Sequence, residues 1–438
     1  MFAVFLPALN FRGDRSPYLW WFYKFLEHFG SNTGFICGQE YFREVNVHAA
    51  NRRWEVNPAT AASLGYGLPS LETLERLTRA DIPDTVWETM ASAFPTDPLA
   101  AFRHLCLDDD VPLRKALDQS LFALESGERS VEAILTCVNC ATLQRLCRER
   151  NLPLIHYELG PLRGPTWLPT AYFDFSGVNG NTEAAARYAA AGALPAGEWL
   201  VPGALRALFL VATLREREPD AELGIGLQIE DDSNVVCYAN GHSGPALLRH
   251  AMREVADGRV RGPVRVRPHP GSMFRLGPLP AALVRDESPS PLQFLQSCQQ
   301  LWTINSSLAA EALLLERRAM VCGESPLAFC LQQQDSATAA RASAFYFLNY
   351  LAPWTLAFSA DYVRWRIQRP AETDIRNRHV EGFMKDKIKA LEARIAELER
   401  QVEERERALA RLHTSYSWRL THPLRLASRF MRKHAAPG

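Results

Sequence analysis

The chain has 438 residues, of which 47% are hydrophobic, and its 49 basic side chains are balanced by 49 acidic ones. This length exceeds one ordinary hydrophobic core, and the composition is that of a globular protein rather than a disordered one. The neutral balance gives no broad field to steer nucleic acid, so no nucleic-acid partner is expected. Nine cysteines without regular spacing favour reduced thiols over a disulfide framework.

The amino-terminal sequence predicts a first β-strand. Residues 1–6 are apolar, but no basic residues precede them as in a signal peptide, and Asn10 and Arg12 soon follow. No apolar run approaches the roughly 20 residues that span a bilayer. Cys137 and Cys140 form a CxxC pair without a second pair or a His at ligand spacing. Buried thiols at a strand–helix junction are therefore favoured over a zinc or redox site.

The first half alternates apolar runs with helical patterns. Its clearest unit is a strand over 131–137, an amphipathic helix over 141–151 and a second strand over 153–157. A helix of that length connects two parallel strands by a right-handed crossover. Further helices are expected over 184–191 and 203–215, where one face is apolar or built of small residues.

A second series of the same kind begins near Glu222. The expected strands are 223–229, 264–267, 301–304 and 319–322, and the expected helices are 244–255, 291–300 and 307–316. Two successive doubly wound halves predict an α/β fold in which two Rossmann-like domains face each other across a cleft. We expect these domains over 1–215 and 216–378, with helices in the aromatic-rich segment 340–369 capping or bridging them.

The carboxyl-terminal part has a different pattern. Apolar residues recur in steps of three and four through about four heptads of segment 379–414, with Arg405 at one such position, which predicts a coiled coil. They are Met384, Ile388, Leu391, Ile395, Leu398, Val402, Leu409 and Leu412. The coiled coil would join the chain to a partner protein or to other copies of itself. A single long solvated helix packed on the rest of the protein is the alternative.

Segment 415–438 is basic and amphipathic. No acidic residue follows Glu406, whereas six arginines and one lysine do. Together with apolar residues such as Trp418 and Phe430, they predict a short interfacial helix that binds an anionic membrane surface. A disordered basic tail is the alternative.

Four groups of polar residues lie just beyond the expected carboxyl ends of strands, where a doubly wound sheet binds its ligands. In the first, residues 264–271, Arg267 ends a strand and two prolines fix the loop that carries His269. An imidazole in that place can hydrogen-bond a phosphate and assist its departure. A rigid turn whose histidine caps a neighbour is the alternative.

In the second group, residues 301–313, a strand runs into a helix. The polar residues at the junction are Thr303, Asn305, Ser306 and Ser307. Backbone N–H groups at a helix start, together with hydroxyls, predict an anion site, although either serine also suits a simple N-cap. Glu311 follows in an otherwise apolar helix, where a carboxylate suits a ribose or a cytosine amine. An exposed helix face is the alternative.

The third and fourth groups supply acids. Residues 227–234 hold three acids in a row after a strand, which is usually a solvated loop but could supply a nucleophile at a cleft. The side chains of interest in that group are Gln228, Asp231 and Asp232. Residues 155–164 end the clear strand of the first half, and their Glu158 and Arg163 would face the same cleft from the opposite wall.

Taken in order, the motifs YELGPLR, LQIEDDSN, RPHPG and TINSSLAAEALL resemble the retaining β-Kdo transferases, CMP-Kdo-dependent enzymes of bacterial capsule and O-antigen lipopolysaccharide synthesis. The resemblance covers residues 130–330 in order and spacing, so it is more specific than any one motif. The family commonly has Lys before His-Pro; Arg267 keeps the charge but changes the geometry. Residues 1–120 carry no motif of the family that we can place.

The resemblance implies a GT-B architecture that needs no metal cofactor. CMP would lie on the second domain, and the glycan acceptor, expected to be lipid-linked, would approach over the first. The expected donor contacts are Arg267, His269, Thr303, Asn305, Ser306, Ser307, Glu311 and Gln228. The enzyme would work in the cytoplasm, bound peripherally to the inner face of the inner membrane through its basic tail.

The resemblance also implies double displacement, in which a carboxylate attacks the anomeric carbon and a second attack restores the β configuration. We assign Asp232 as the nucleophile, with Asp231 as the competing choice. Glu158 is the expected general acid/base, and Arg163 the expected partner of the Kdo carboxylate. A transferase that uses CMP-sialic acid and a non-catalytic scaffold of glycan assembly are the competing functions.

Overall fold

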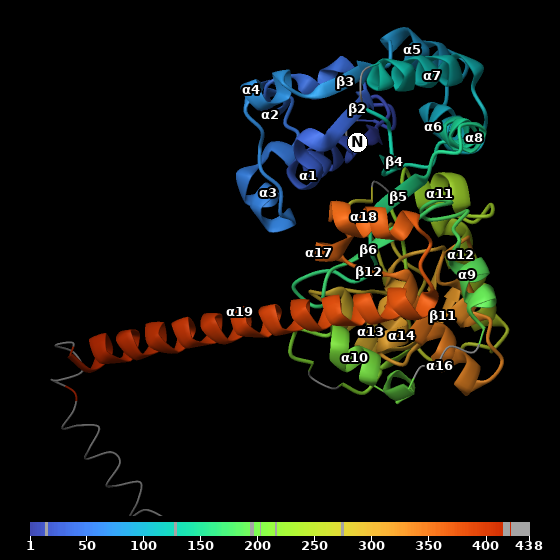
Figure 1. Cartoon of the computed structure of the whole chain (residues 1–438). Helices are drawn as coiled ribbons and strands as arrows, with labels where there is room; N and C mark the ends of the chain where they lie inside the picture. The colour runs from blue at the N-terminus through green and yellow to red at the C-terminus, as the bar shows by residue number, and fades with distance from the viewer. Residues whose placement is uncertain are drawn as a thin grey trace, which may run out of the picture. The chain divides into compact units, whose positions relative to one another are not determined.

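The computed structural model describes residues 1–13, 16–126, 129–192, 197–201, 203–214, 217–272, 276–414 and 421. It divides the chain into two units, Met1–Met384 and Lys385–Gly438. Both β-sheets lie in the first unit, and a long helix, α19 (Glu372–Thr414), ends the described part of the chain (Figure 1). The predicted α/β fold of two Rossmann-like halves followed by a long helix is therefore confirmed.

The first sheet has seven strands in the order β12-β6-β5-β4-β1-β2-β3. Its parallel part consists of β1 (Phe2–Phe5), β2 (Thr33–Cys37), β3 (Thr78–Asp81), β4 (Ala133–Thr136) and β5 (Leu154–Leu159). β6 (Thr170–Asp174) and β12 (Ala352–Pro353) extend it in antiparallel fashion. The sheet is thus parallel only in part, where we expected it to be wholly so, because β6 returns directly from β5 rather than through a crossover helix.

Helices that connect the strands cover the first sheet. They are α1 (Tyr18–Phe29), α2 (Val45–Ala50), α3 (Pro58–Leu64), α4 (Leu71–Glu75), α5 (Asp84–Ser92), α6 (Pro98–Leu107), α7 (Val111–Glu125) and α8 (Ala141–Glu149). α9 (Ala184–Ala191) and α10 (Ala204–Phe209) follow the sheet in sequence. α10 is shorter than the helix expected over 203–215, because Leu210 is extended and forms a β-bridge with Trp167.

An aromatic core packs between α1 and the first sheet. Trp20 and Trp21 are 1% exposed, and their ring centroids lie 4.3 Å apart. From late in the chain, α17 (Trp354–Ala357) and α18 (Ala360–Ile367) return to the same core, where the Phe358 ring lies 6.2 Å from that of Trp21 (Figure 1). Each buried side chain of this size stabilises the fold by about 1.5–3 kcal/mol. The aromatic segment therefore belongs to the core of the first sheet.

The second sheet is wholly parallel. Its strands are β7 (Ala221–Gly226), β8 (Val264–Arg267), β9 (Leu283–Arg285), β10 (Cys298–Thr303) and β11 (Arg318–Val321). Their order, β9-β8-β7-β10-β11, repeats the order β3-β2-β1-β4-β5 of the first sheet. In both sheets the strand order reverses beside the first strand, and ligands bind at the carboxyl ends of strands at such a point.

The helices of the second half are short, apart from one. They are α11 (Ser233–Tyr238), α12 (Gly244–Ala256), α13 (Pro291–Ser297), α14 (Leu308–Leu314), α15 (Ala328–Leu331) and α16 (Ser336–Phe345). A π-helical turn over Tyr346–Tyr350 continues α16 and leads into β12. α11 packs toward the other half of the molecule, since its Val236 and Cys237 contact the core formed by the first sheet with α6 and α7.

Three further expectations concern the termini and the cysteines. All nine cysteines are among the described residues and are free thiols, and Cys137 and Cys140 lie buried between β4 and α8. Within the described residues, no helix combines the length and the apolar character needed to cross a membrane. The predicted interfacial helix of segment 415–438 lies outside the described residues, apart from residue 421.

Candidate active site

Loops from both halves line one cavity of about 310 Å³ within the unit Met1–Met384. The loops follow β1, β5, β7, β8, β10 and β11, all at the carboxyl ends of their strands. Of the twelve residues expected at the site, eight line this cavity: Glu158, Arg163, Gln228, Asp232, His269, Asn305, Ser306 and Ser307. The two switch points of the fold thus meet at the same cavity.

Glu158 is the penultimate residue of β5 and is half-buried. Burial, and then the negative charge of Asp232, raise the pKa of the Glu158 carboxyl group to about 7. One of its oxygens, Oε1, accepts a hydrogen bond of 2.7 Å from the backbone N–H of Leu159. A carboxyl group with this pKa exists in both protonation states near neutral pH, as a group that must act in turn as acid and base requires.

Asp232 reaches the cavity from the second half as the N-cap of α11. Its Oδ1 accepts a hydrogen bond of 3.0 Å from the backbone N–H of Asn234 and one of 3.4 Å from the Ser233 hydroxyl group. Both hydrogen bonds that the described residues make to this carboxylate go to Oδ1. The side chain is therefore held in one orientation, and Oδ2 is the oxygen that can act on a ligand.

A polar network at the ends of β7 and β10 fixes this region. The Gln228 side chain donates to Asn305 Oδ1 (2.8 Å) and accepts from the Asn305 backbone N–H (2.9 Å). Asn305 Nδ2 donates in turn to the carbonyl oxygen of Asn234 in α11. Thr303 is fully buried and donates to Gln228 Oε1 at 3.2 Å. Thr303 thus holds the network together from beneath the cavity, where we had expected it to contact the donor.

His269, Ser306 and Ser307 also line the cavity from the second half of the chain. The backbone N–H of Gly271 donates to His269 Nδ1 at 3.0 Å. In the neutral ring the proton then lies on Nε2, which can donate to an anionic oxygen. Ser306 Oγ accepts from the backbone N–H of Leu308 at 3.3 Å, and Ser307 lies beside it at the start of α14. These side chains offer hydrogen-bond donors to an anion without a net positive charge.

Two of the expected donor contacts are engaged elsewhere. Arg267 Nη1 pairs with the buried carboxylate of Asp286 and donates to the Ser288 carbonyl oxygen at 2.9 Å. Glu311 Oε2 accepts a hydrogen bond of 2.8 Å from Trp167 Nε1, which joins α14 to the first half. Burial raises the pKa of Glu311 to about 7. Neither residue lines the cavity, and among the described lining residues Asp231 does not appear either.

Several lining residues were missed from the sequence. Arg12, in the loop after β1, interacts electrostatically with Asp232, Asp231 and Glu158. Asn179 has a φ of 67° and donates to the Ser233 hydroxyl group at 2.8 Å. The hydroxyl groups of Tyr172 and Tyr346 hydrogen-bond at 2.8 Å across 174 residues of sequence. The sequence offered one signal for these missed residues: Arg12 lies in a loop after the first strand of a doubly wound fold, where ligands bind.

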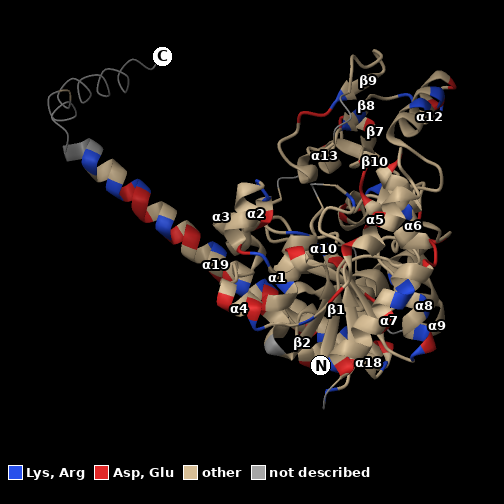
Figure 2. Cartoon of the chain, turned by 90° about the horizontal axis from the view of Figure 1, so that it is seen from above, with Lys and Arg blue, Asp and Glu red and all other residues tan. Residues whose placement is uncertain are grey.

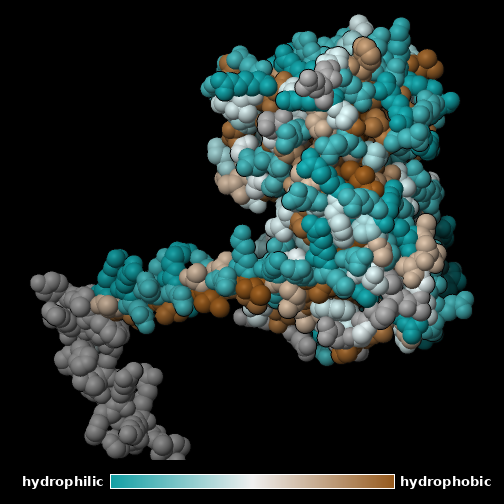
Figure 3. All heavy atoms as spheres, viewed as in Figure 1, coloured by the Kyte–Doolittle hydropathy of each residue, from teal (hydrophilic) through white to brown (hydrophobic). Residues whose placement is uncertain are grey.

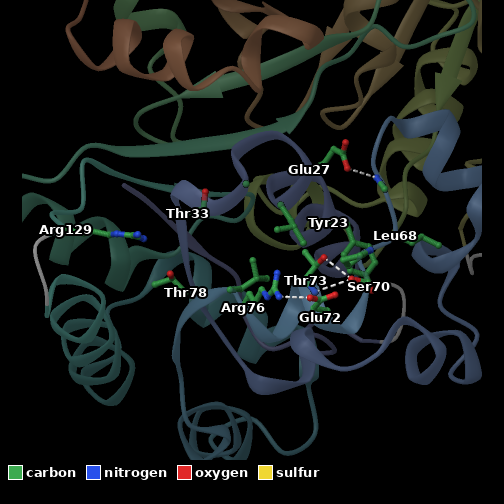
Figure 4. Close-up of a pocket in the computed structure, with 15 residues that line it drawn as sticks. Tyr23, Glu27, Thr33, Leu68, Ser70, Glu72, Thr73, Arg76, Thr78 and Arg129 are labelled. Carbon is green, nitrogen blue, oxygen red and sulfur yellow. Dashed lines mark hydrogen bonds and ion pairs between the residues drawn. The ribbon is translucent and has the colours of Figure 1, made fainter.

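Two other cavities are larger, but size does not identify the site. One of about 700 Å³ opens at Thr33 and Thr78, the first residues of β2 and β3, and Figure 4 shows it with Tyr23 and Glu27 of α1. It lies at the amino ends of the strands, away from the switch points. The other, of about 760 Å³, is lined by residues 8–11, which lead directly to Arg12. The two cavities are thus lined by neighbouring parts of the same loop after β1 but share no lining residue.

No group of three or more His, Cys, Asp or Glu within the described residues is arranged to hold a metal ion. The independence from metal inferred from the resemblance stays a prediction.

Residues 4–183 match the family model described as the glycosyltransferase 99 family N-terminal domain. No curated protein matches the chain by sequence. Among solved structures, KpsC of Thermosulfurimonas dismutans, a β-Kdo 2,4 transferase, is 16% identical over 51% of this chain and 82% of its own, with a TM-score of 0.37. The β-Kdo 2,7 transferase of the same KpsC is 14% identical over 53% and 81%, with a TM-score of 0.38. SnogD, a glycosyltransferase from Streptomyces nogalater, is 13% identical over 83% and 99%, with a TM-score of 0.30.

The family match begins within β1 and so reaches the residues in which the sequence offered no motif. It confirms that the chain resembles a glycosyltransferase family. Over its amino-terminal part the chain is thus similar to the glycosyltransferases of family 99, and glycosyl transfer is the activity that this match supports.

Proposed function

We propose that the protein transfers β-Kdo from CMP-β-Kdo to a surface-glycan acceptor with retention of configuration, through a glycosyl-enzyme on Asp232. The observation that carries the proposal is the meeting of Glu158 and Asp232 at one cavity, each delivered by a different sheet. Retention by two displacements requires one nucleophilic carboxylate and one group that can both give and take a proton.

The electrostatics support this division of roles. Burial and the charge of Asp232 raise the pKa of Glu158 to about 7, so that the Glu158 carboxyl group can both give and take a proton near neutral pH. Arg12 and Arg163 lie close enough to oppose this shift. Arg12 is thereby suited to stabilise the carboxylate of Asp232 before attack, and Arg163 to bind the carboxylate of the sugar.

In the first step, Asp232 Oδ2 attacks the anomeric carbon, and the bond from that carbon to the phosphate oxygen of CMP breaks. CMP leaves with the electron pair, and His269 Nε2 with the Ser306 and Ser307 hydroxyl groups donates to its phosphate. In the second step, the Glu158 carboxylate takes the proton of an acceptor hydroxyl group, whose oxygen attacks the same carbon and releases Asp232. Two inversions restore the β configuration.

The acceptor is proposed to lie in the cavity of about 760 Å³ that residues 8–11 of the first half line, next in sequence to Arg12 of the smaller cavity. A lipid-linked glycan would bring the enzyme to the inner face of the bacterial inner membrane. The basic, amphipathic sequence of segment 415–438 is the proposed membrane contact.

Intact-mass measurement with CMP-Kdo tests the proposal. The Glu158→Gln enzyme should gain the mass of one Kdo residue and keep it, because the acceptor hydroxyl group or water is no longer deprotonated. Asp232→Ala should show no gain, whereas Asp231→Ala, as the matched control, should. A gain in Asp232→Ala but not in Asp231→Ala would move the nucleophile to Asp231. If Glu158→Gln and the unaltered enzyme both fail to gain mass, the double displacement is wrong.

A further inference from the structure

The second unit of the chain presents an apolar stripe. Along α19 beyond Met384, six large apolar side chains are each 43–56% exposed: Ile388, Leu391, Ile395, Leu398, Val402 and Leu409. They recur in steps of three and four, so they lie along one side of the helix, where Figure 3 shows a brown stripe below a hydrophilic face in teal. So regular an apolar face on an otherwise charged helix needs a partner to cover it.

The kinds of apolar residue in the stripe specify the number of helices. In heptad notation, Ile388, Ile395 and Val402 occupy position a, whereas Leu391 and Leu398 occupy position d. β-Branched residues at a combined with Leu at d favour two parallel strands over three or four. The same pattern would not arise for a helix that merely packs on a globular surface, because that requires a wider apolar face.

The charged residues beside the stripe specify the orientation. Position g holds Lys387 and Arg394, and position e holds Glu392, Glu399 and Glu406. In a parallel pair, each g residue meets the e residue five positions further along the other helix, which brings Lys387 to Glu392 and Arg394 to Glu399. In an antiparallel pair, e would meet e and g would meet g, so that like charges would face each other.

Several ion pairs within the helix join residues on its outer side. Arg400 pairs with Glu397 and Glu404, and Arg407 pairs with Glu403. These residues occupy positions b, c and f, on the side of the helix away from the stripe. Figure 2 shows blue and red residues in alternation along α19. The outer face is thus satisfied by the helix itself, whereas the a, d, e and g positions match a second copy.

Arg405 is the exception at a d position. In an in-register pair the two Arg405 side chains lie at one level, so their repulsion is a cost that the neighbouring Glu406 residues reduce.

We propose that a second copy of the same chain covers this stripe, and that the two helices form a parallel, in-register, two-stranded coiled coil over residues 385–411. This inference does not depend on the proposed catalytic activity, and its partner is defined by charge complementarity of the helix with itself.

Sedimentation equilibrium of the full chain tests the number of copies. The expected mass is twice the 49.2 kDa of one chain. Ile395→Asp, which puts a charge into the seam at position a, should give the single-chain mass at concentrations at least 100-fold above those that dissociate the unaltered protein. Ala396→Asp, one residue away on the exposed outer side, should remain dimeric. A monomeric or trimeric mass for the unaltered chain would overturn the proposal.

Charge reversal tests the orientation. Arg394→Glu should raise the dissociation constant of the dimer about tenfold, because two Arg–Glu pairs become Glu–Glu pairs. The double variant Arg394→Glu, Glu399→Arg should restore it, since the pairing is regained with the charges exchanged. In an antiparallel pair the single change would break no Arg–Glu pair between the helices, so tighter binding, or no change, would contradict the parallel arrangement.

Discussion

The five parallel strands of the first sheet follow the same order as the five strands of the second, yet the two sheets differ in their cores and in how they position the site residues. The first has seven strands and an aromatic core that draws on α1, α17 and α18. The second has five strands and a smaller aliphatic core, and its outer strands β9 and β11 are largely half-buried or exposed. The first delivers Glu158 from within a strand, whereas the second delivers its site residues from loops and short helices.

This difference indicates where rigidity is needed. A group that must transfer a proton at a fixed point benefits from a strand in a well-packed sheet. In the second half, by contrast, polar networks such as that of Gln228 and Asn305 hold the loops of the site without a large core. The two halves also contain one carboxyl group each with a pKa raised to about 7, namely Glu158 and Glu311.

These two carboxyl groups give the prediction with the largest effect. Glu158→Gln should lower kcat by about 10²–10⁴-fold, because acid–base catalysis is lost. Glu311→Gln should lower it far less, since Glu311 is held by Trp167 and does not line the cavity. Steady-state rates of donor and acceptor turnover measure both. Equal losses would show that the pKa, and not the position at the cavity, distinguishes the important carboxyl group.

The pH dependence of the transfer rate also distinguishes Glu158 from Glu311. Transfer from the glycosyl-enzyme needs Glu158 as the carboxylate, so its single-turnover rate should rise with pH. The rate should level off below pH 7, because Asp232, once esterified, no longer contributes the negative charge that helps to raise the pKa of Glu158 in the free enzyme. The Glu311→Gln enzyme should keep this rise. A rise that persists in Glu158→Gln, or disappears in Glu311→Gln, would assign the titration to another group.

The cores themselves are compared by removing one tryptophan from each. Trp21→Ala should lower the free energy of unfolding by about 4 kcal/mol, because the ring is 1% exposed and packs among other aromatic rings. Trp302→Ala, in β10, should lower it by about 3 kcal/mol, since that ring is 8% exposed and stacks on the ring of His250. Urea unfolding measures both. A larger loss for Trp302 would contradict the assignment of the stronger core to the first sheet.

The prediction with the smallest effect concerns the hydrogen bond between Trp167 and Glu311, which joins the two halves. Trp167→Phe removes the hydrogen bond that favours the charged form of Glu311, so the pKa of Glu311 should rise further above its ordinary value. A raised carboxyl pKa stabilises the fold at low pH and loses this contribution as pH rises through the folded value. Trp167→Phe should therefore cost about 1–2 kcal/mol above pH 7.5 and less at pH 5. Urea unfolding at both pH values checks this, and an equal cost at both would contradict it.

The sequence predicted best what depends on local pattern. Apolar runs located the strands that carry the site, and the polar residues just after them included Glu158, Asp232 and His269, which line the cavity. What failed depends on partners distant in the chain. Arg267 is directed to Asp286, and Glu311 to Trp167, by contacts that no spacing in the sequence discloses.

The missed residues have the same explanation. Arg12 is a lone arginine in a loop, and its interaction with Glu158 exists only when β1 and β5 lie in one sheet. The outermost strand of the antiparallel extension, β12, was missed because it has only two residues, Ala352 and Pro353. Such a short strand has no periodicity of its own and forms because the aromatic helices around it pack against the first sheet.

That short strand has a consequence for synthesis of the protein. β6 ends at Asp174, and its neighbour β12 begins at Ala352, so roughly 180 residues must be made between the two. At ribosomal rates of about 5–20 residues per second, the edge of β6 waits about 9–36 s for its partner. During this interval the second sheet emerges whole, whereas the first, although begun earlier, still lacks its last strand and part of its aromatic core. The half that is translated first is thus the half that is finished last, and a nascent chain stalled before residue 352 would expose an unpaired strand edge to chaperones or to other chains.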